Sequence, residues 1–205
     1  MFSGIVINKF KVVELNDSPG LRVLGIELNP ELITKIKTSD SISVNGVCLT
    51  VSKILENTVF FDIMSETLEK TNLIKIQLND FVNIELSLKY EDVIGGHLLS
   101  GHIDTTATLV DIKKPENNYI ITIKVPEALT KYIFNKGYAG LNGCSLTVCD
   151  FDKDTFKVFL IPETLSLTNL EMLGVGDQIN IEIDRQTQII VETIERVLKE
   201  NYISK

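Results

Sequence analysis

Short segments of apolar and β-branched residues run through the chain and are separated by Asn, Asp, Gly and Pro. Examples are 21–28, 59–64, 119–125 and 156–161, and such segments are typical of β-strands. Two helical segments, PELITKI and PEALTKYI, begin with proline, which suits the first turn of a helix. With so little helix between strands, a doubly wound parallel sheet is excluded. The pattern predicts an all-β fold of small closed antiparallel barrels.

The whole pattern occurs twice. The segment NGVCLTV begins at Asn45 and NGCSLTV at Asn142, while DFVNIE begins at Asp80 and DQINIE at Asp177, so that 142 − 45 = 177 − 80 = 97. The segments SGIV and ETLEKTNL return with the same offset as SGHI and ETLSLTNL. Separate blocks that keep one offset indicate a tandem duplication, and two similar modules predict two similar pockets.

The repeat divides the chain into a first barrel over 1–96, a second barrel over 97–186 and a tail over 187–205. In the tail, Ile190, Ile194, Val197 and Leu198 follow the spacing of one helical face. The tail is therefore predicted to be a helix outside the repeat. Its apolar face either packs against its own barrel or associates with other subunits, and the pattern leaves both open.

Composition narrows the possible partners and compartments. The net charge is −8 with no run of Lys or Arg, which argues against nucleic acid. No apolar run approaches the roughly 18 residues of a membrane span, and the start of the chain has no secretory signal, so we expect a soluble cytoplasmic protein. Cys48, Cys144 and Cys149 form no CxxC pair and are expected to be free thiols. The two histidines have no further ligands nearby, so no metal site is predicted.

Positions where the two copies differ indicate unequal roles. Cys48 corresponds to Ser145, and Ile5 corresponds to His102, so only the second copy has an acid–base group there. The Asn-Gly pairs are interpreted as tight turns. Thr50, and Ser145 with Thr147, follow them in alternation along a strand and are predicted to face a barrel mouth. Structural alternatives stay open: Cys48 as a small buried side chain, and His102 as a hydrogen-bonding residue.

Taken together, the motifs carry a resemblance to a known family. MFSGIV, SISVNGVCLTV, GGHLLSGHID, KGYAGLNGCSLTV, IPETLSLTNL and the final helix, in this order, resemble the riboflavin synthases of the duplicated-barrel type over essentially the whole chain. The resemblance implies two six-stranded antiparallel Greek-key barrels with short helices, and a C-terminal α-helix that holds a homotrimer together. Association with a lumazine synthase shell is a possible further partnership.

The resemblance also implies an activity. Two molecules of 6,7-dimethyl-8-ribityllumazine would exchange a four-carbon unit to give riboflavin and 5-amino-6-(ribitylamino)uracil, without metal or organic cofactor. Each active site would lie between the first barrel of one subunit and the second barrel of its neighbour. A reaction between two identical molecules suits two homologous pockets, and opposite roles suit pockets that have diverged.

Catalytic roles carry over by position. His102 would shuttle protons, while Ser145 and Thr147 would activate a hydroxyl or water that adds to one lumazine. Cys48 would lie against the ring in the other pocket. Ser41 and Asp184 would assist proton transfer or orientation, although a plain strand end is the alternative for Asp184.

Substrate contacts carry over in the same way, and the ribityl hydroxyls would find partners at Thr67 and Thr164. For the first barrel they are Gly4, Ile5, Val6, Cys48, Leu49, Thr50, Asp62, Ile63, Met64, Ser65, Glu66 and Thr67. For the second barrel they are Gly101, His102, Ile103, Lys136, Ser145, Leu146, Thr147, Phe159, Leu160, Ile161, Pro162, Glu163 and Thr164.

The chain departs from the family pattern at Ser3, Ser65 and Asn142, where threonine, proline and aspartate are usual. None of these changes removes a candidate catalytic group. The main alternative function is a non-catalytic lumazine- or flavin-binding antenna or storage protein with the same duplicated fold. A flavin-binding module of an oxidoreductase is a further alternative, but no nicotinamide-binding half follows.

Overall fold

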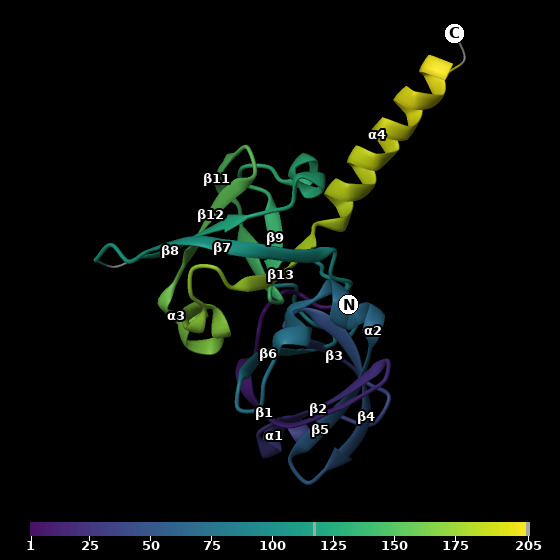
Figure 1. The fold of residues 1–205 in the computed structure, drawn as a ribbon, viewed down its shortest axis with the longest axis vertical. Helices are drawn as coiled ribbons and strands as arrows, with labels where there is room; N and C mark the ends of the chain where they lie inside the picture. The colour runs from purple at the N-terminus through teal and green to yellow at the C-terminus, as the bar shows by residue number, and fades with distance from the viewer. Residues whose placement is uncertain (117, 204–205) are drawn as a thin grey trace.

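The computed structural model describes residues 1–116 and 118–203, and it consists of two β-rich halves followed by a projecting helix (Figure 1). The first half contains β1 (Asn8–Ser18), β2 (Leu21–Glu27), α1 (Pro30–Ile33), β3 (Ser41–Val44), β4 (Val47–Leu55), β5 (Thr58–Met64), α2 (Ser65–Lys70), the 3-10 helix η1 (Asn72–Lys75) and β6 (Phe81–Leu86). The second half contains β7 (Thr105–Lys113), β8 (Tyr119–Lys124), η2 (Glu127–Tyr132), β9 (Tyr138–Leu141), β10 (Cys144–Thr147), β11 (Cys149–Asp152), β12 (Thr155–Leu160), α3 (Pro162–Leu167), η3 (Asn169–Met172) and β13 (Gln178–Ile183), and α4 (Arg185–Ile203) ends the chain.

The first half is a closed antiparallel barrel with the strand order β1-β2-β5-β4-β3-β6. Its ladder closes where Asn8–Lys11 of β1 pair with β6. A closed sheet has no free edge strands, which is the advantage expected for a small all-β module. The predicted closed barrel is confirmed for this half.

The second half repeats the order with one interruption. Its sheet runs β10-β9-β13-β7-β8-β12-β11, and β10 and β11 together correspond to β4 of the first half. The strand is divided at Val148, whose amide N donates to the carbonyl O of Gly137 at 2.9 Å. The sheet is therefore curled, with seven strands in place of the expected six, because one strand is in two pieces.

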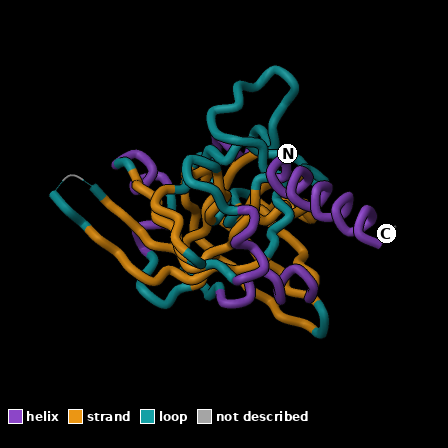
Figure 2. The backbone as a smooth tube through the Cα atoms, turned by 90° about the horizontal axis from the view of Figure 1, so that it is seen from above, coloured by secondary structure: helices purple, strands orange, loops and turns teal. Residues whose placement is uncertain are grey.

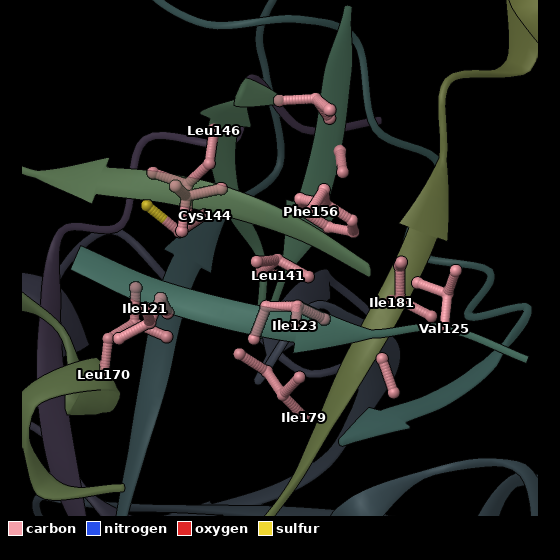
Figure 3. Packing of buried hydrophobic residues seen from close by; sticks show 14 of the residues in the cluster. Ile121, Ile123, Val125, Leu141, Cys144, Leu146, Phe156, Leu170, Ile179 and Ile181 are labelled. Atoms are coloured by element: carbon pink, nitrogen blue, oxygen red, sulfur yellow. The ribbon is translucent and has the colours of Figure 1, made fainter. Parts of the chain in front are cut away.

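Both interiors are filled with aliphatic and aromatic side chains. Figure 3 shows the core of the second half, where Phe156, Ile121 and Ile181 pack between the strands. Phe61 and Ile63 are buried in the same way in the first half. Burial of one such side chain contributes roughly 1.5–3 kcal/mol. Because the interiors are packed, any ligand must bind on the outside of the barrels.

The predicted Asn-Gly turns are confirmed and form part of the contact between the halves. Asn45 and Asn142 have φ values of 47° and 44°, and the following glycines also have positive φ. Their side chains join a buried network of amides that crosses between the halves; its members are Asn45, Asn72, Asn83, Asn142, Asn169 and Asn180. The pattern of bonds follows the repeat, since Asn83 donates to the carbonyl of Asn142 at 2.9 Å and Asn180 donates to that of Asn45 at 2.8 Å.

Helix α4 confirms the predicted tail helix and begins one residue after Asp184. Its first turns contact η2 through the ion pair of Lys131 with Glu195 and the bond from Tyr132 to Glu192. The rest extends away from both halves (Figure 1; Figure 2), and its apolar residues are exposed: Ile189, Ile190, Ile194, Val197 and Leu198. No helix within residues 1–116 and 118–203 has the length and apolarity needed to cross a membrane.

Candidate functional site

Each half contributes a Ser-Gly segment to the other half. The carbonyl O of Gly4 accepts a hydrogen bond from the amide N of Ser145 at 2.8 Å, and that of Gly101 accepts from the amide N of Cys48 at 2.8 Å. Gly4 and Gly101 have φ values of 75° and 78°, which favour glycine. A Cβ atom on either would lie 2.5 Å from the Cβ of its partner. The absence of a side chain therefore allows these crossed contacts.

A buried carboxylate anchors each Ser-Gly segment to its own half. Glu85 of β6 accepts bonds from the amide and hydroxyl of Ser3 and from the amide of Gly4. Glu182 of β13 does the same for Ser100 and Gly101. Burial raises the pKa of both carboxyls, and the hydrogen bonds from the serines and glycines oppose that shift.

These crossed contacts correct the assignment of two substrate-contact segments. We expected Gly4, Ile5 and Val6 to belong to the first barrel and Gly101, His102 and Ile103 to the second. That assignment is wrong, because Val6 is buried in the core of the second half and Ile103 packs on the core of the first. The chain crosses between the halves at each Ser-Gly segment. The position of such a segment in the sequence therefore does not show which barrel it packs against.

The candidate polar side chains lie outside the barrels and not in a barrel mouth. In β4, Leu49 is buried in the core while Cys48 and Thr50 on either side are more exposed, and β10 repeats this with Leu146 between Ser145 and Thr147. The expectation for Thr50, Ser145 and Thr147 is therefore wrong, since the interiors are already filled. Five of the expected contact residues are buried in the cores: Val6, Leu49, Ile63, Leu146 and Leu160.

The first outer site is an open cavity of about 260 Å³ beside Cys48. His102 and Ile103 line one side, and Glu66 and Thr67 at the start of α2 line another. The ion pair between Glu66 and Lys70, at 2.8 Å, lies at its edge. The cavity offers a thiol, an exposed imidazole and hydroxyl groups to a small polar ligand.

The second outer site has a different arrangement around Ser145. The Nδ1 atom of His97 lies 2.6 Å from the Oγ of Ser145, and the His97 ring stacks on Tyr138 with 5.2 Å between ring centroids. His97 is only 8% exposed, and burial lowers its pKa while the charge of Asp184 opposes that shift. The histidine beside Ser145 is therefore His97, whereas His102, expected there, lies beside Cys48.

The other candidate residues occupy several places around these sites. Ser41 pairs with Thr50 across β3 and β4 and lines a separate cavity of about 480 Å³. Asp184 caps α4 by accepting bonds from the amide and hydroxyl of Thr187. Asp62 accepts a bond from Ser52 in a further cavity of about 360 Å³.

The remaining contact residues belong to the outer surface of each half. Lys136 lies exposed just before β9, with a φ of 68°. Ile5, which follows Gly4, is exposed. Exposed side chains at the ends of β5 and β12 and at the starts of α2 and α3 account for the others, which are Met64, Ser65, Phe159, Ile161, Pro162, Glu163 and the partly exposed Thr164. Among the described residues, no group of three or more His, Cys, Asp or Glu side chains could hold a metal ion.

The three cysteines are free and differ in accessibility. Burial raises the pKa of Cys144 to about 12, while Cys48 and Cys149 are only half-buried. We expect a thiol reagent at pH 8 to modify Cys48 and Cys149 and to reach Cys144 only after unfolding, because the thiolate is the reactive form. Mass spectrometry of labelled peptides measures this. Labelling of Cys144 in the folded protein as fast as of Cys149 would contradict it.

Sequence reasoning missed three residues of this arrangement. Glu85 and Glu182 share the repeat offset, 182 − 85 = 97, and a carboxylate kept at one place in two apolar strands was a usable signal. His97 gave no such signal, because it lies in the connection between the two copies and outside the repeated blocks. Its position is set by Gly96, where a Cβ would lie 2.6 Å from the Cβ of Ser145.

Comparisons with known proteins agree with this architecture. The family described as "Lumazine binding domain" matches residues 3–87 and again 100–184. Riboflavin synthase of Escherichia coli K12 is 47% identical over 97% of this chain and 93% of its own length, and that of Chlamydia pneumoniae is 43% identical over 97% of both. Crystal structures of LumP with riboflavin and with 6,7-dimethyl-8-(1'-D-ribityl) lumazine superpose with TM-scores of 0.84 and 0.82, at 26% identity, covering 89% of this chain and 99% of LumP.

Proposed function

The chain belongs to the family of riboflavin synthases with a duplicated lumazine-binding domain, and from this premise we propose that it catalyses a dismutation. Two molecules of 6,7-dimethyl-8-ribityllumazine react; one gives up a four-carbon unit and leaves as 5-amino-6-(ribitylamino)uracil, and the other takes up that unit and becomes riboflavin. The atoms balance within these two substrates, so the reaction needs no co-reactant. We propose the cytoplasm as its location.

The observation that carries the proposal is the pair of related but chemically different outer sites. The first presents the Cys48 thiol and the exposed His102 imidazole, and the second presents the Ser145 hydroxyl held by a buried His97. Two identical molecules that take opposite roles need two sites that recognise the same shape and differ in their reactive groups. The reaction then depends on bringing two rings together and moving protons.

We assign roles to the polar side chains on that basis. Ser145 and Thr147 activate the hydroxyl or water that adds to the lumazine in the second site. Cys48 contacts the ring in the first site, and His102 exchanges protons there. Ser41 and Asp184 orient the ligands, and α2 and α3, which begin near Thr67 and Thr164, receive the ribityl hydroxyls.

We propose a homotrimer as the working assembly, with each active site between the first barrel of one subunit and the second barrel of the next. The exposed apolar residues of α4 support self-association through this helix, because a monomer would leave that face in water. Docking of the trimer inside a lumazine synthase shell is a further partnership that we propose for the same assembly.

The test is turnover by the purified protein of 6,7-dimethyl-8-ribityllumazine alone. We expect one riboflavin for every two lumazines consumed, with the pyrimidine formed in equal amount, measured by absorbance and chromatography. Ser145→Ala is expected to lower kcat by about 100-fold or more, because a positioned acid–base group typically contributes that much. Ser18→Ala, at an exposed position in β1, is the matched control and should keep the wild-type rate.

Two outcomes would contradict the proposal. Tight binding of lumazine or riboflavin with no turnover would indicate an antenna or storage protein, the function favoured by the likeness to LumP in its ligand complexes. Turnover that Ser145→Ala leaves unchanged would refute the role of the second site while leaving the overall activity in place.

A further inference from the structure

His97 belongs to the segment that joins the two halves, and this segment reaches the second site. The segment joining the two halves passes over Ser145, and Gly95 and Gly96 lead directly into His97. The sequence contains one other histidine, His102, which lines the first site beside the crossed Gly101.

The close fit of this segment shows how His97 is held. A Cβ on Gly96 would lie 2.4 Å from the carbonyl O of Ser3 and 2.8 Å from the Oγ of Ser145. Only glycine allows the backbone to approach this closely, and the approach brings the next side chain onto the Ser145 hydroxyl. Tyr138 stacks on the His97 ring at an interplanar angle of 18°, and its counterpart in the first half is Ser41 (138 − 97 = 41).

Among the described residues, the His97 ring finds a hydrogen-bond partner at one of its two nitrogens. Nδ1 lies 2.6 Å from Oγ, whereas Nε2 is buried without a hydrogen-bond partner. A histidine kept only for structure normally has both ring nitrogens satisfied when it is buried. Leaving Nε2 unsatisfied costs stability, and the ring is nevertheless held where its polar contact is with the serine.

We propose that His97 is the positioning residue of the second site, which orients the Ser145 hydroxyl and takes up its proton during the reaction. The inference rests on the proposed function. In the tautomer with the proton on Nε2, Nδ1 accepts a hydrogen bond from the Ser145 hydroxyl. As the attacking hydroxyl or water loses its proton to Oγ, the Ser145 proton passes to Nδ1. The imidazolium returns that proton through Ser145 when the product forms, so no proton is gained or lost overall.

The surroundings of His97 determine the pH dependence. The titratable groups that face it are Tyr138 from β9 and Asp184 at the end of β13. Burial lowers the pKa of His97 below its usual value, and the Asp184 charge opposes this only in part. The neutral ring is the active form, so activity is present above that pKa and is lost as the pH falls through it.

The experiment compares kcat, its pH profile and riboflavin binding in His97→Asn, His97→Phe and wild type. Asparagine can keep a hydrogen bond to Ser145 but cannot take up a proton, and phenylalanine keeps the buried ring and its stack on Tyr138. We expect both variants to bind riboflavin within about threefold of wild type, to lose about 100-fold in kcat and to lack the acid limb of the profile.

Each other result identifies a different failure. If His97→Phe keeps the wild-type rate, the ring only fills space and the inference is wrong. If the acid limb persists in His97→Asn and disappears in His102→Gln, the proton passes through His102 instead. If wild type gives no riboflavin at all, the proposed function fails and this inference falls with it. If the wild-type protein forms riboflavin and shows the acid limb, the proposed function stands, and the variants then test the role of His97 alone.

Discussion

Replacing Asn142 with leucine is expected to destabilise the protein by roughly 3–6 kcal/mol, a large share of the 5–15 kcal/mol typical of a folded protein. The Oδ1 of Asn142 accepts bonds from the Nδ2 of Asn72 at 3.0 Å and from the amide N of Asn180 at 2.9 Å. Asn142 is 0% exposed, so leucine would leave the buried amide of Asn180 without this acceptor and would remove one of the bonds of Asn72 Nδ2, which keeps its bond to the carbonyl O of Gln178. Urea unfolding followed by far-ultraviolet circular dichroism measures the change in free energy.

A matched control separates the lost bonds from backbone strain. Asn142 has a positive φ, which leucine tolerates poorly, and Asn79 has a positive φ of 76° at an exposed position. Asn79→Leu should therefore cost only the conformational term, roughly 1–2 kcal/mol. Equal losses in the two variants would mean that the amide network between the halves contributes little to stability.

Replacing Gly101 with alanine is expected to cost roughly 2–5 kcal/mol and to distort the first outer site. The new Cβ would lie 2.5 Å from the Cβ and 2.8 Å from the amide N of Cys48, and the positive φ of Gly101 adds strain. The chain must move away from Cys48, which breaks the bond from the Cys48 amide to the Gly101 carbonyl. Unfolding free energy and riboflavin affinity together measure the effect.

Gly20→Ala is the control for this variant. Gly20 has a φ of 80°, but a Cβ added to it would have no atom within 4 Å. Alanine at this position therefore causes backbone strain but no steric clash. It should lose only about 1–2 kcal/mol and keep wild-type affinity. Gly101→Ala with a similarly small loss would show that the crossed segment yields easily, contrary to the tight contact described above.

Local sequence signals were sufficient for most of the fold. The offset of 97 gave the duplication, β-branched segments gave the strands, and the spacing from Ile190 to Leu198 gave α4. These features depend on neighbours in sequence or on the repeat itself. The break of the strand at Val148 could not be predicted, because the sequence LTV is identical in both halves. The break depends instead on how β10 and β11 pair with different strands.

The candidate sites could be predicted only in part. The repeat comparison selected Cys48 and Ser145, and the structure places both on the outer surface of the halves beside a crossed glycine. The choice between His97 and His102 depends on the path of the connecting segment, which no local pattern encodes. The crossed contacts join residues far apart in the chain, Gly4 with Ser145 (145 − 4 = 141) and Gly101 with Cys48 (101 − 48 = 53), so the periodicity of a single strand does not predict them.

The reciprocal exchange of the Ser-Gly segments determines how the outer sites respond when the protein is diluted. If the two halves were separate chains, each outer site would be completed only when they met, and its occupancy would fall with protein concentration. Within one chain the partner segment is present at an effective concentration in the millimolar range or above, because the connection between the halves is short. Within each chain the crossed Ser-Gly segments therefore stay in place on dilution, whereas contacts between subunits have no such protection.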